Sequence, residues 1–141
     1  MNSILGKRPS LAWCLTAGFG LFCLGVIVLA NFSATYPMFI ASVRQLPGGD
    51  KTAHFLLVGV LALLLNSAMN AATVRVAGLT FLKGNLILVL LATLEELSNL
   101  IQPGRTFSLL DLQFNYLGIF AFGWMSLWFA KRQARIIHRP M

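Results

Sequence analysis

Four long stretches without a charged residue dominate the pattern of apolar and polar positions along the chain. About 20 apolar residues in helical conformation are enough to cross the hydrocarbon core of a bilayer. The pattern therefore predicts four membrane-spanning helices followed by a basic tail. We expect these five segments at about residues 11–31, 52–73, 84–102, 111–130 and 131–141. The predicted fold is an all-α, polytopic four-transmembrane-helix bundle that forms one membrane domain over residues 1–141.

Composition supports the membrane assignment. Of the 141 residues, 57% are hydrophobic and 11% are charged, and the mean hydropathy is +0.77. A soluble domain has about 25% charged residues, so an ordinary water-soluble domain is excluded. The spans and their connections use nearly the whole chain and leave no room for a soluble catalytic domain of typical size. Any function must therefore lie among the helices and their loops.

The distribution of positive charge predicts the orientation in the membrane. The formal net charge is +7, from eleven Lys and Arg against four acids. Eight of the eleven basic residues fall on one side of the predicted bundle: Lys7, Arg8, Arg75, Lys83, Lys131, Arg132, Arg135 and Arg139. By the positive-inside rule this side is cytoplasmic, so both termini are expected on the cytoplasmic side of the membrane. We expect membrane lipids as partners of these basic flanks and no nucleic acid.

The first apolar stretch has a second interpretation. Residues 1–8 resemble the basic region of a secretory signal peptide, and Val28-Leu29-Ala30 could serve as a cleavage site. The apolar run is longer than in a usual signal peptide, which favours an uncleaved helix. Cys14 and Cys23 are nine residues apart on this helix. They are therefore separated by about 13 Å along its axis, too far for a disulfide between them.

The acidic residues gather at the outer ends of the second, third and fourth predicted helices. They are Asp50, Glu95, Glu96 and Asp111. His54 and Asn115 each follow an acid by four residues, which places them about 6 Å deeper on the same helix face. A carboxylate that faces lipid costs several kcal/mol, so these polar faces are expected to turn inward. The spacing predicts one shared polar site in the outer half of the bundle.

The candidate ligand-binding residues combine these acids with nearby cations and amides. They are Asp50, Lys51, His54, Glu96, Asn99, Arg105, Asp111 and Asn115. Arg105 is prominent because its guanidinium can bind a carboxylate or a phosphate with two hydrogen bonds. Asp50, Lys51 and Asp111 can also be interpreted as helix caps or interfacial anchors. Glu95 and Glu96 point about 100° apart on a helix, so both need not face one pocket.

Asn66 and Asn70 lie near the inner end of the second predicted helix. We interpret them as residues that hydrogen-bond between helices or lie at the membrane interface.

The candidate residues also form a pattern that resembles a known family. The pattern is Asp50-Lys51-x-x-His54-Phe55, then Glu96, then Pro103-Gly104-Arg105-Thr106-Phe107-x-x-x-Asp111-x-x-x-Asn115-x-x-Gly118. It is similar to the VanZ-like family of small bacterial membrane proteins and covers residues 50–118. Two positions depart from that family: Asn99 stands where a Gln is common, and Val58 where a Tyr is frequent.

The resemblance implies an integral membrane protein of the bacterial cell envelope. The founding member of the family is associated with low-level resistance to the glycopeptide teicoplanin. The resemblance implies no particular reaction and no metal or cofactor. It also does not name a ligand or an oligomeric state.

Three classes of function compete. In the first, an envelope accessory protein binds an anionic amphiphile, such as an envelope precursor or a lipid-linked ligand, through Arg105, Lys51 and the amides. In the second, an enzyme uses Glu96 or Asp111 as general base and His54 as acid or base, with or without a metal on these three residues. In the third, the polar cluster only joins helices in a scaffold. A cleft lined by these residues between the second, third and fourth helices would favour the first class.

Overall fold

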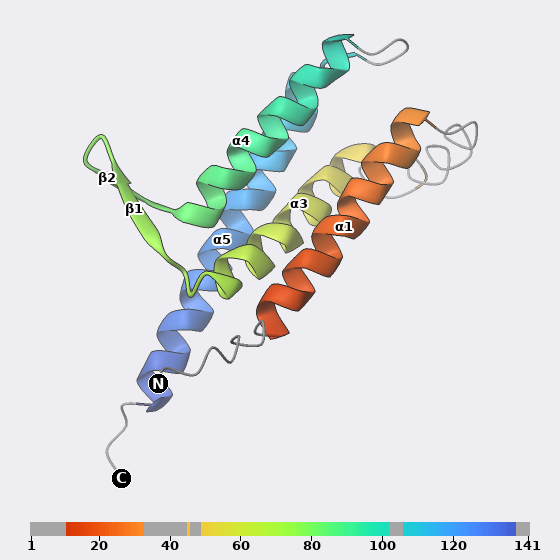
Figure 1. Cartoon of the computed structure of the whole chain (residues 1–141). Coiled ribbons are helices and arrows are strands. Elements are labelled where there is room, and N and C mark those ends of the chain that lie inside the picture. Colours follow the sequence, from red (N-terminus) through yellow and green to blue (C-terminus); the bar gives the residue numbers. More distant parts are fainter. Residues whose placement is uncertain (1–10, 33–44, 46–48, 102–105, 138–141) are drawn as a thin grey trace, which may run out of the picture.

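The computed structural model describes residues 11–32, 45, 49–101 and 106–137, and within them the chain forms four α-helices and one β-hairpin (Figure 1). The α-helices are α1 Leu11–Phe32, α3 Gly49–Ala68, α4 Lys83–Ser98 and α5 Leu109–Ile137. The short elements are β1 Thr73–Val76, β2 Leu79–Leu82 and the 3-10 helix η1 Asn99–Ile101. The prediction of a mostly helical fold is confirmed.

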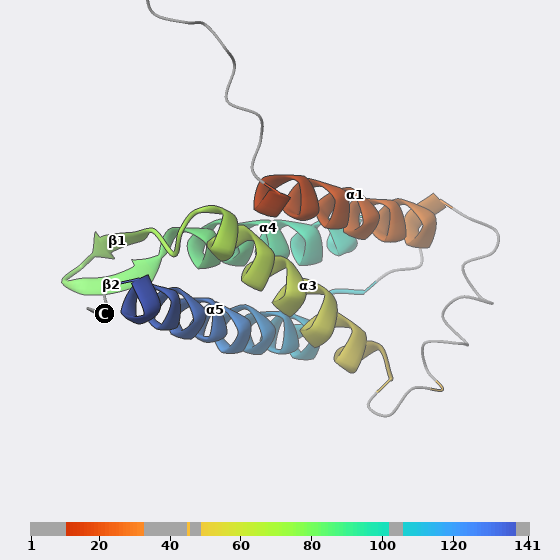
Figure 2. The same ribbon diagram turned by 90° about the horizontal axis from the view of Figure 1, so that it is seen from below.

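Successive helices run in opposite directions, and their axes lie roughly side by side (Figures 1 and 2). The most extensive packing joins α3 to α5, and α4 packs against both of them. Helix α1 lies at the edge of the bundle and packs mainly against α3. Most of its large apolar side chains, such as Leu21 and Leu29, are therefore exposed.

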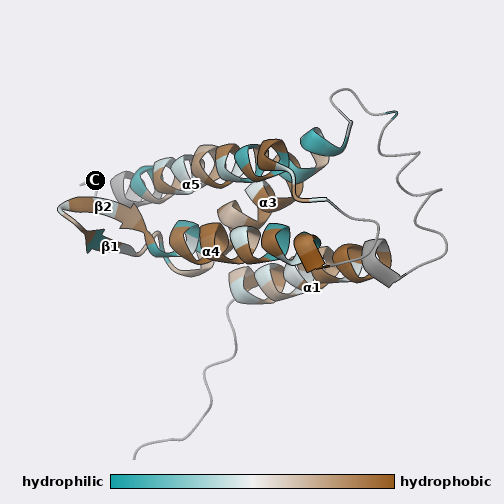
Figure 3. Cartoon of the chain, turned by 90° about the horizontal axis from the view of Figure 1, so that it is seen from above, coloured by the Kyte–Doolittle hydropathy of each residue, from teal (hydrophilic) through white to brown (hydrophobic). Residues whose placement is uncertain are grey.

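Three of the helical segments are long and apolar enough to cross a membrane: Leu11–Leu29, Gly49–Ala68 and Lys83–Ile101. Figure 3 shows hydrophobic residues along the length of all four helices. Helix α5, which corresponds to the fourth predicted span, is long enough with its 29 residues, but it is not among the segments apolar enough to cross a membrane. Its apolar run is interrupted by polar residues such as Gln113 and Asn115.

Glycines allow α3 and α5 to pack closely. A Cβ atom on Gly118 of α5 would collide with the backbone carbonyl of Phe55 on α3. A Cβ on Gly59 of α3 would lie 2.7 Å from the ring of Phe122 on α5. Small residues at a crossing let helix backbones approach, which is the usual way that helices associate in a membrane. Gly118, the last residue of the pattern noted in the sequence, therefore has a packing role in the structure.

The second connection differs from the prediction, because α3 ends at Ala68 and a hairpin follows. Asn70 and Ala71 both have a φ of 52°, a left-handed conformation that ends the helix. Strands β1 and β2 then pair antiparallel around Ala77 and Gly78, whose φ values are 50° and 83°. Positive φ at both central residues is typical of the tight turns that match strand twist. The helix predicted over 52–73 is therefore Gly49–Ala68.

Two other boundaries shift. The third predicted helix, 84–102, is α-helical only as far as Ser98 and continues as η1 to Ile101. The predicted tail at 131–141 begins instead as helix, because α5 continues to Ile137. Lys and Arg are good helix formers and can extend along an apolar surface while their charge reaches water, so the change to basic residues need not end the helix. Arg132 lies over the ring of Trp128, 5.3 Å from its centroid.

Within the described residues, the acids lie at one end of the bundle and the basic residues other than Lys51 lie toward the other. Asp50 and Asp111 occupy the first turns of α3 and α5, and Glu95 and Glu96 lie near the end of α4. All four belong to the end where α1 finishes (Figure 1). The basic residues on the hairpin, at the start of α4 and late in α5 belong to the other end: Arg75, Lys83, Lys131 and Arg132. The acids of the three helices therefore lie at the same end of the bundle.

Candidate functional site

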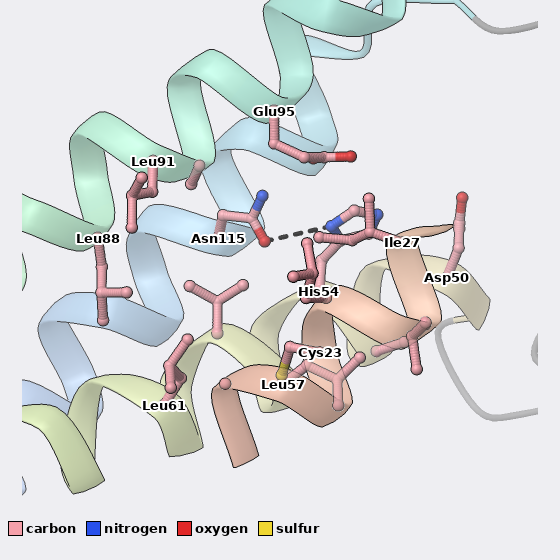
Figure 4. A pocket seen from close by; sticks show the side chains of 16 residues that line it. Cys23, Ile27, Asp50, His54, Leu57, Leu61, Leu88, Leu91, Glu95 and Asn115 are labelled. Carbon is pink, nitrogen blue, oxygen red and sulfur yellow. Dashed lines mark hydrogen bonds between the residues drawn. The ribbon is translucent and has the colours of Figure 1, made fainter. Parts of the chain in front are cut away.

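A cavity of about 440 Å³ lies among the four helices toward the acidic end of the bundle (Figure 4). The wall formed by α3 is a single face of that helix, with residues spaced three or four apart: Asp50, Ala53, His54, Leu57, Val58 and Leu61. Helix α4 contributes a face of the same spacing with Leu88, Leu91, Ala92 and Glu95. Residues with this spacing share one side of a helix, so the cavity runs along the helix axes.

The cavity has one polar end and apolar walls. Four of its lining residues are polar: Asp50, His54, Glu95 and Asn115. They lie near the start of α3, the end of α4 and the start of α5. Helix α1 forms a third wall, beside those of α3 and α4, and contributes Gly20, Cys23, Leu24, Val26 and Ile27. A lining of this kind, mostly apolar with a few grouped polar side chains, is typical of sites for small molecules.

A hydrogen bond between helices orients the imidazole of His54. Its Nδ1 lies 3.2 Å from Oδ1 of Asn115, which joins α3 to α5. An amide oxygen can only accept, so Nδ1 carries the hydrogen. In the neutral ring Nε2 is then an acceptor. Figure 4 shows the ring of His54 and the carboxyl end of Glu95 directed into the cavity.

Lys51 links two acids beside the cavity. Its Nζ lies 3.2 Å from Oδ1 of Asp50 and 3.3 Å from Oδ1 of Asp111. Asp50 lines the cavity, whereas Lys51 and Asp111 do not. Lys51 and Asp111 therefore fit the interpretation as anchors. Asp50 is the one of the three that fits the interpretation as a ligand-binding residue. The ion pair between Lys51 and Asp111 connects the first turns of α3 and α5.

Glu96 lies away from the cavity and supports the start of α5. Its side chain is buried at 1% exposure, and Oε1 accepts a hydrogen bond of 2.6 Å from the backbone N of Ser108. Oγ of Ser108 in turn accepts a hydrogen bond from the backbone N of Asp111, at 3.2 Å. Ser108 therefore caps α5, and Glu96 holds the cap. A carboxylate is also favoured at this end of the helix by the helix dipole. The candidate site predicted from the sequence included Glu96, but it is Glu95 that lines the cavity.

Two further candidate residues lie outside the cavity or outside the described chain. Asn99, in η1, is buried at 3% exposure, and its Oδ1 has no hydrogen-bond partner among the described residues. Arg105 lies outside the described residues. Of the eight candidates, the structure therefore brings Asp50, His54 and Asn115 together around one cavity.

Sequence reasoning missed two parts of the site. The spacing Leu88-Leu91-Ala92-Glu95 on α4 was a readable signal that Glu95 shares a face with apolar residues. The contribution of α1 carried no such signal, because its lining residues are as apolar as its exposed ones. Cys23 lies on this wall, and the exposed Cys14 does not.

A second polar contact joins α3 and α4 toward the basic end. Nδ2 of Asn66 donates to Oδ1 of Asn85 at 2.7 Å and to the backbone carbonyl of Ala62 at 2.8 Å. Asn66 and Asn85 are buried at 0% and 5% exposure. The predicted role of Asn66 as a hydrogen bonder between helices is confirmed. Asn70 lies in the turn after α3, outside the helix.

Within the described part of the chain, no group of three His, Cys, Asp or Glu residues is placed to hold a metal ion. The alternative of a metal on His54, Glu96 and Asp111 therefore has no geometric support in those residues. Comparisons with protein-family models, with curated proteins and with solved structures found no match to this chain.

Proposed function

We propose that this chain is a VanZ-like integral membrane protein of the bacterial cell envelope that binds an amphiphile in the cavity. The observation that carries the proposal is the division of the cavity into a polar end and apolar walls. An amphiphile has the same division between headgroup and hydrocarbon chain. Its headgroup would lie at Asp50, His54, Glu95 and Asn115, and its chain would lie between α1 and α4.

The dimensions of the cavity support this proposal. Its volume of about 440 Å³ lies within the roughly 300–1,000 Å³ typical of small-molecule pockets. From Asp50 to Leu61, the α3 wall extends about 16 Å along the helix axis. The chain of a lipid can follow this wall toward the middle of the bundle. Helix α1, which packs mainly against α3, closes one side of the space.

The orientation in the membrane forms part of the proposal. We place α5 as a fourth span and retain α1 as an uncleaved helix, because α1 supplies a wall of the cavity. The basic end, with Arg75, Lys83 and Lys131, would face the cytoplasm by the positive-inside rule. The polar end of the cavity would then face outward, at the level of the outer headgroups.

The test compares two phenylalanine substitutions on α1. Gly20 lines the cavity, and a Cβ at this position would lie 3.9 Å from Cδ1 of Leu61, so Gly20→Phe fills the cavity. Gly18 has nothing within 4 Å of a Cβ and does not line the cavity, so Gly18→Phe is the matched control. Native mass spectrometry of each detergent-extracted protein would detect a co-purified amphiphile. We expect the adduct in the wild type and in Gly18→Phe, and its loss in Gly20→Phe.

Two results would contradict the proposal. One is the same adduct, in the same amount, in Gly20→Phe and Gly18→Phe, because the amphiphile would then bind elsewhere. The other is an absence of any adduct in the wild type, even after amphiphiles are added to the purified protein.

A specific observation favours one second candidate, an acid–base enzyme acting on the bound amphiphile. Asn115 fixes Nδ1 of His54 as a donor, so Nε2 is available to accept a proton in the cavity. Glu95 provides a second proton-transfer group in the same space. Incubation of the protein with a lipid extract, followed by mass spectrometry, would reveal a product that His54→Gln fails to form. Unchanged lipids would exclude this candidate for that extract.

A further inference from the structure

We propose that the β1–β2 hairpin lies along the surface of the bilayer, with one apolar face against the lipid chains and Arg75 at the phosphate groups of the lipids. The proposal concerns the end of the bundle opposite the cavity and does not depend on what the cavity binds. It depends on α3 and α4 crossing the membrane, because the hairpin connects these two helices.

The register of the two strands gives the hairpin one fully apolar face. Paired residues, and residues two apart along a strand, lie on the same face of a sheet. Two neighbouring pairs on one face are apolar on both strands: Val74 with Phe81 and Val76 with Leu79. The other face carries the polar pair of Arg75 and Thr80. The hairpin is therefore amphipathic.

The apolar face is uncovered toward the turn. The turn segment Val76-Ala77-Gly78-Leu79 contains no polar side chain, and Val76 and Leu79 are 48% and 63% exposed. Turns that face water usually carry Asn, Asp or Ser beside glycine. Within the described residues, the main contact of the hairpin with a helix joins β2 to α4. A two-stranded hairpin with so little support is only marginally stable in water, so its apolar face needs another apolar surface.

The position of the hairpin identifies the bilayer as that surface. Strand β1 begins at Thr73, shortly after α3 ends at Ala68, and α4 begins at Lys83, directly after β2. Both ends of the hairpin are therefore held where two candidate membrane spans meet the membrane surface. The hairpin extends sideways from the bundle, across the direction of the helix axes (Figure 1). If these axes cross the bilayer, the hairpin runs along its surface.

The charge of this end fits the phosphate groups of phospholipids. Arg75, on the polar face, and Lys83, at the start of α4, are both exposed. All four acids of the sequence lie at the other end of the bundle, so no carboxylate of this chain neutralises Arg75 there. A guanidinium binds phosphate oxygens with two hydrogen bonds. An apolar face opposite a basic polar face is typical of segments that lie in the membrane interface.

The experiment measures the depth of spin labels on the full chain in vesicles of phosphatidylcholine and phosphatidylglycerol, by electron paramagnetic resonance. Leu79→Cys and Thr80→Cys, each in a background of Cys14→Ser and Cys23→Ala, are a matched pair, because the two residues are adjacent on β2 and lie on opposite faces. Collisions with oxygen report the hydrocarbon region, and collisions with a water-soluble nickel chelate report water. We expect the ratio of oxygen to nickel collisions to be several times higher for Leu79→Cys than for Thr80→Cys.

Two further variants complete the experiment. Leu90→Cys, at an exposed position within the span formed by α4, supplies the reference for a label among lipid chains. Leu79→Cys should approach this reference more closely than Thr80→Cys does. Adding Arg75→Gln to Leu79→Cys should lower its oxygen-to-nickel ratio, because the hairpin loses its contact with the phosphates. Circular dichroism of each variant confirms that it is folded.

Three results would overturn the proposal in whole or in part. Equally high nickel collisions for Leu79→Cys and Thr80→Cys would place the hairpin in water. Protection of Leu79→Cys from both oxygen and nickel would mean that protein, such as a second copy of this chain, covers the apolar face. An unchanged ratio on adding Arg75→Gln would overturn the role of Arg75 and leave the apolar contact standing.

Discussion

Glu95 and Glu96 are adjacent on α4, yet their carboxylates serve different parts of the protein. Glu95 lines the cavity, and Glu96 accepts a hydrogen bond from the backbone N of Ser108 at the start of α5. The difference follows from helix geometry, because successive side chains point about 100° apart. One residue therefore faces α1 and α3 across the cavity, and the next faces the turn that begins α5.

Glu96 is expected to stabilise the fold. Glu96→Ala removes the acceptor for the backbone N of Ser108 and a negative charge at the start of α5. We expect the free energy of unfolding to fall by about 2 kcal/mol, the range of hydrogen bonds to charged groups. Thermal unfolding in detergent would measure the change. Glu96→Gln retains an acceptor and should lose less, and Glu95→Ala should be the mildest of the three. An equal loss in Glu95→Ala would contradict this assignment.

The crossing of α3 and α5 should not tolerate a larger residue at Gly118. Gly118→Ala would push a methyl group against the carbonyl of Phe55, so the two backbones must separate. We expect a destabilisation of about 1–3 kcal/mol, as for other overpacked sites. Gly59→Ala should cost less, because the ring of Phe122 can rotate away. Gly25→Ala on α1 is the control, since nothing lies within 4 Å of its Cβ. Equal stability of the Gly118 and Gly25 variants would show that the close crossing does not form.

Asn66 and Asn85 should be energetically coupled. Asn66→Leu or Asn85→Leu alone leaves a buried amide without its partner on the neighbouring helix. Pairs of this kind in membrane proteins contribute about 0.6 kcal/mol on average, with a maximum near 1.7. A double-mutant cycle based on unfolding in detergent would measure the coupling. Additive effects of the two substitutions would mean that the 2.7 Å hydrogen bond does not contribute to stability.

Cysteine labelling would test the proposed orientation. In a background of Cys14→Ser and Cys23→Ala, Thr106→Cys lies at the acidic end and Thr80→Cys on the hairpin, and both positions are exposed. We expect an impermeant maleimide to label Thr106→Cys in intact cells, because the acidic end faces outward in the proposed orientation. Thr80→Cys should react only after the membrane is permeabilised. The reverse pattern would invert the topology and place the polar end of the cavity in the cytoplasm.

The sequence by itself determined where the main helices lie. Uncharged stretches longer than about 18 residues have few alternatives to helix in an apolar environment, so α1 and α3 were predicted to within a few residues. The acidic end was also predictable, since the position of each acid along its helix sets its depth. The hairpin had a readable signal as well. Val74-Arg75-Val76 and Leu79-Thr80-Phe81 alternate in polarity around Ala77-Gly78, but the stretch is short enough to be taken for a connection.

The tertiary structure alone decided which polar residues share a site. Depth along a helix follows from the sequence, whereas rotation about the helix axis depends on packing against neighbouring helices. The close contact of Gly118 with the Phe55 backbone sets how α3 meets α5 and brings His54 opposite Asn115. The role of α1 was equally hidden, because a residue that lines the cavity, such as Gly20, is indistinguishable in sequence from one that is exposed on the outside of the bundle, such as Gly18. Membrane helices lack the contrast between a polar outside and an apolar inside that reveals a buried face in soluble proteins.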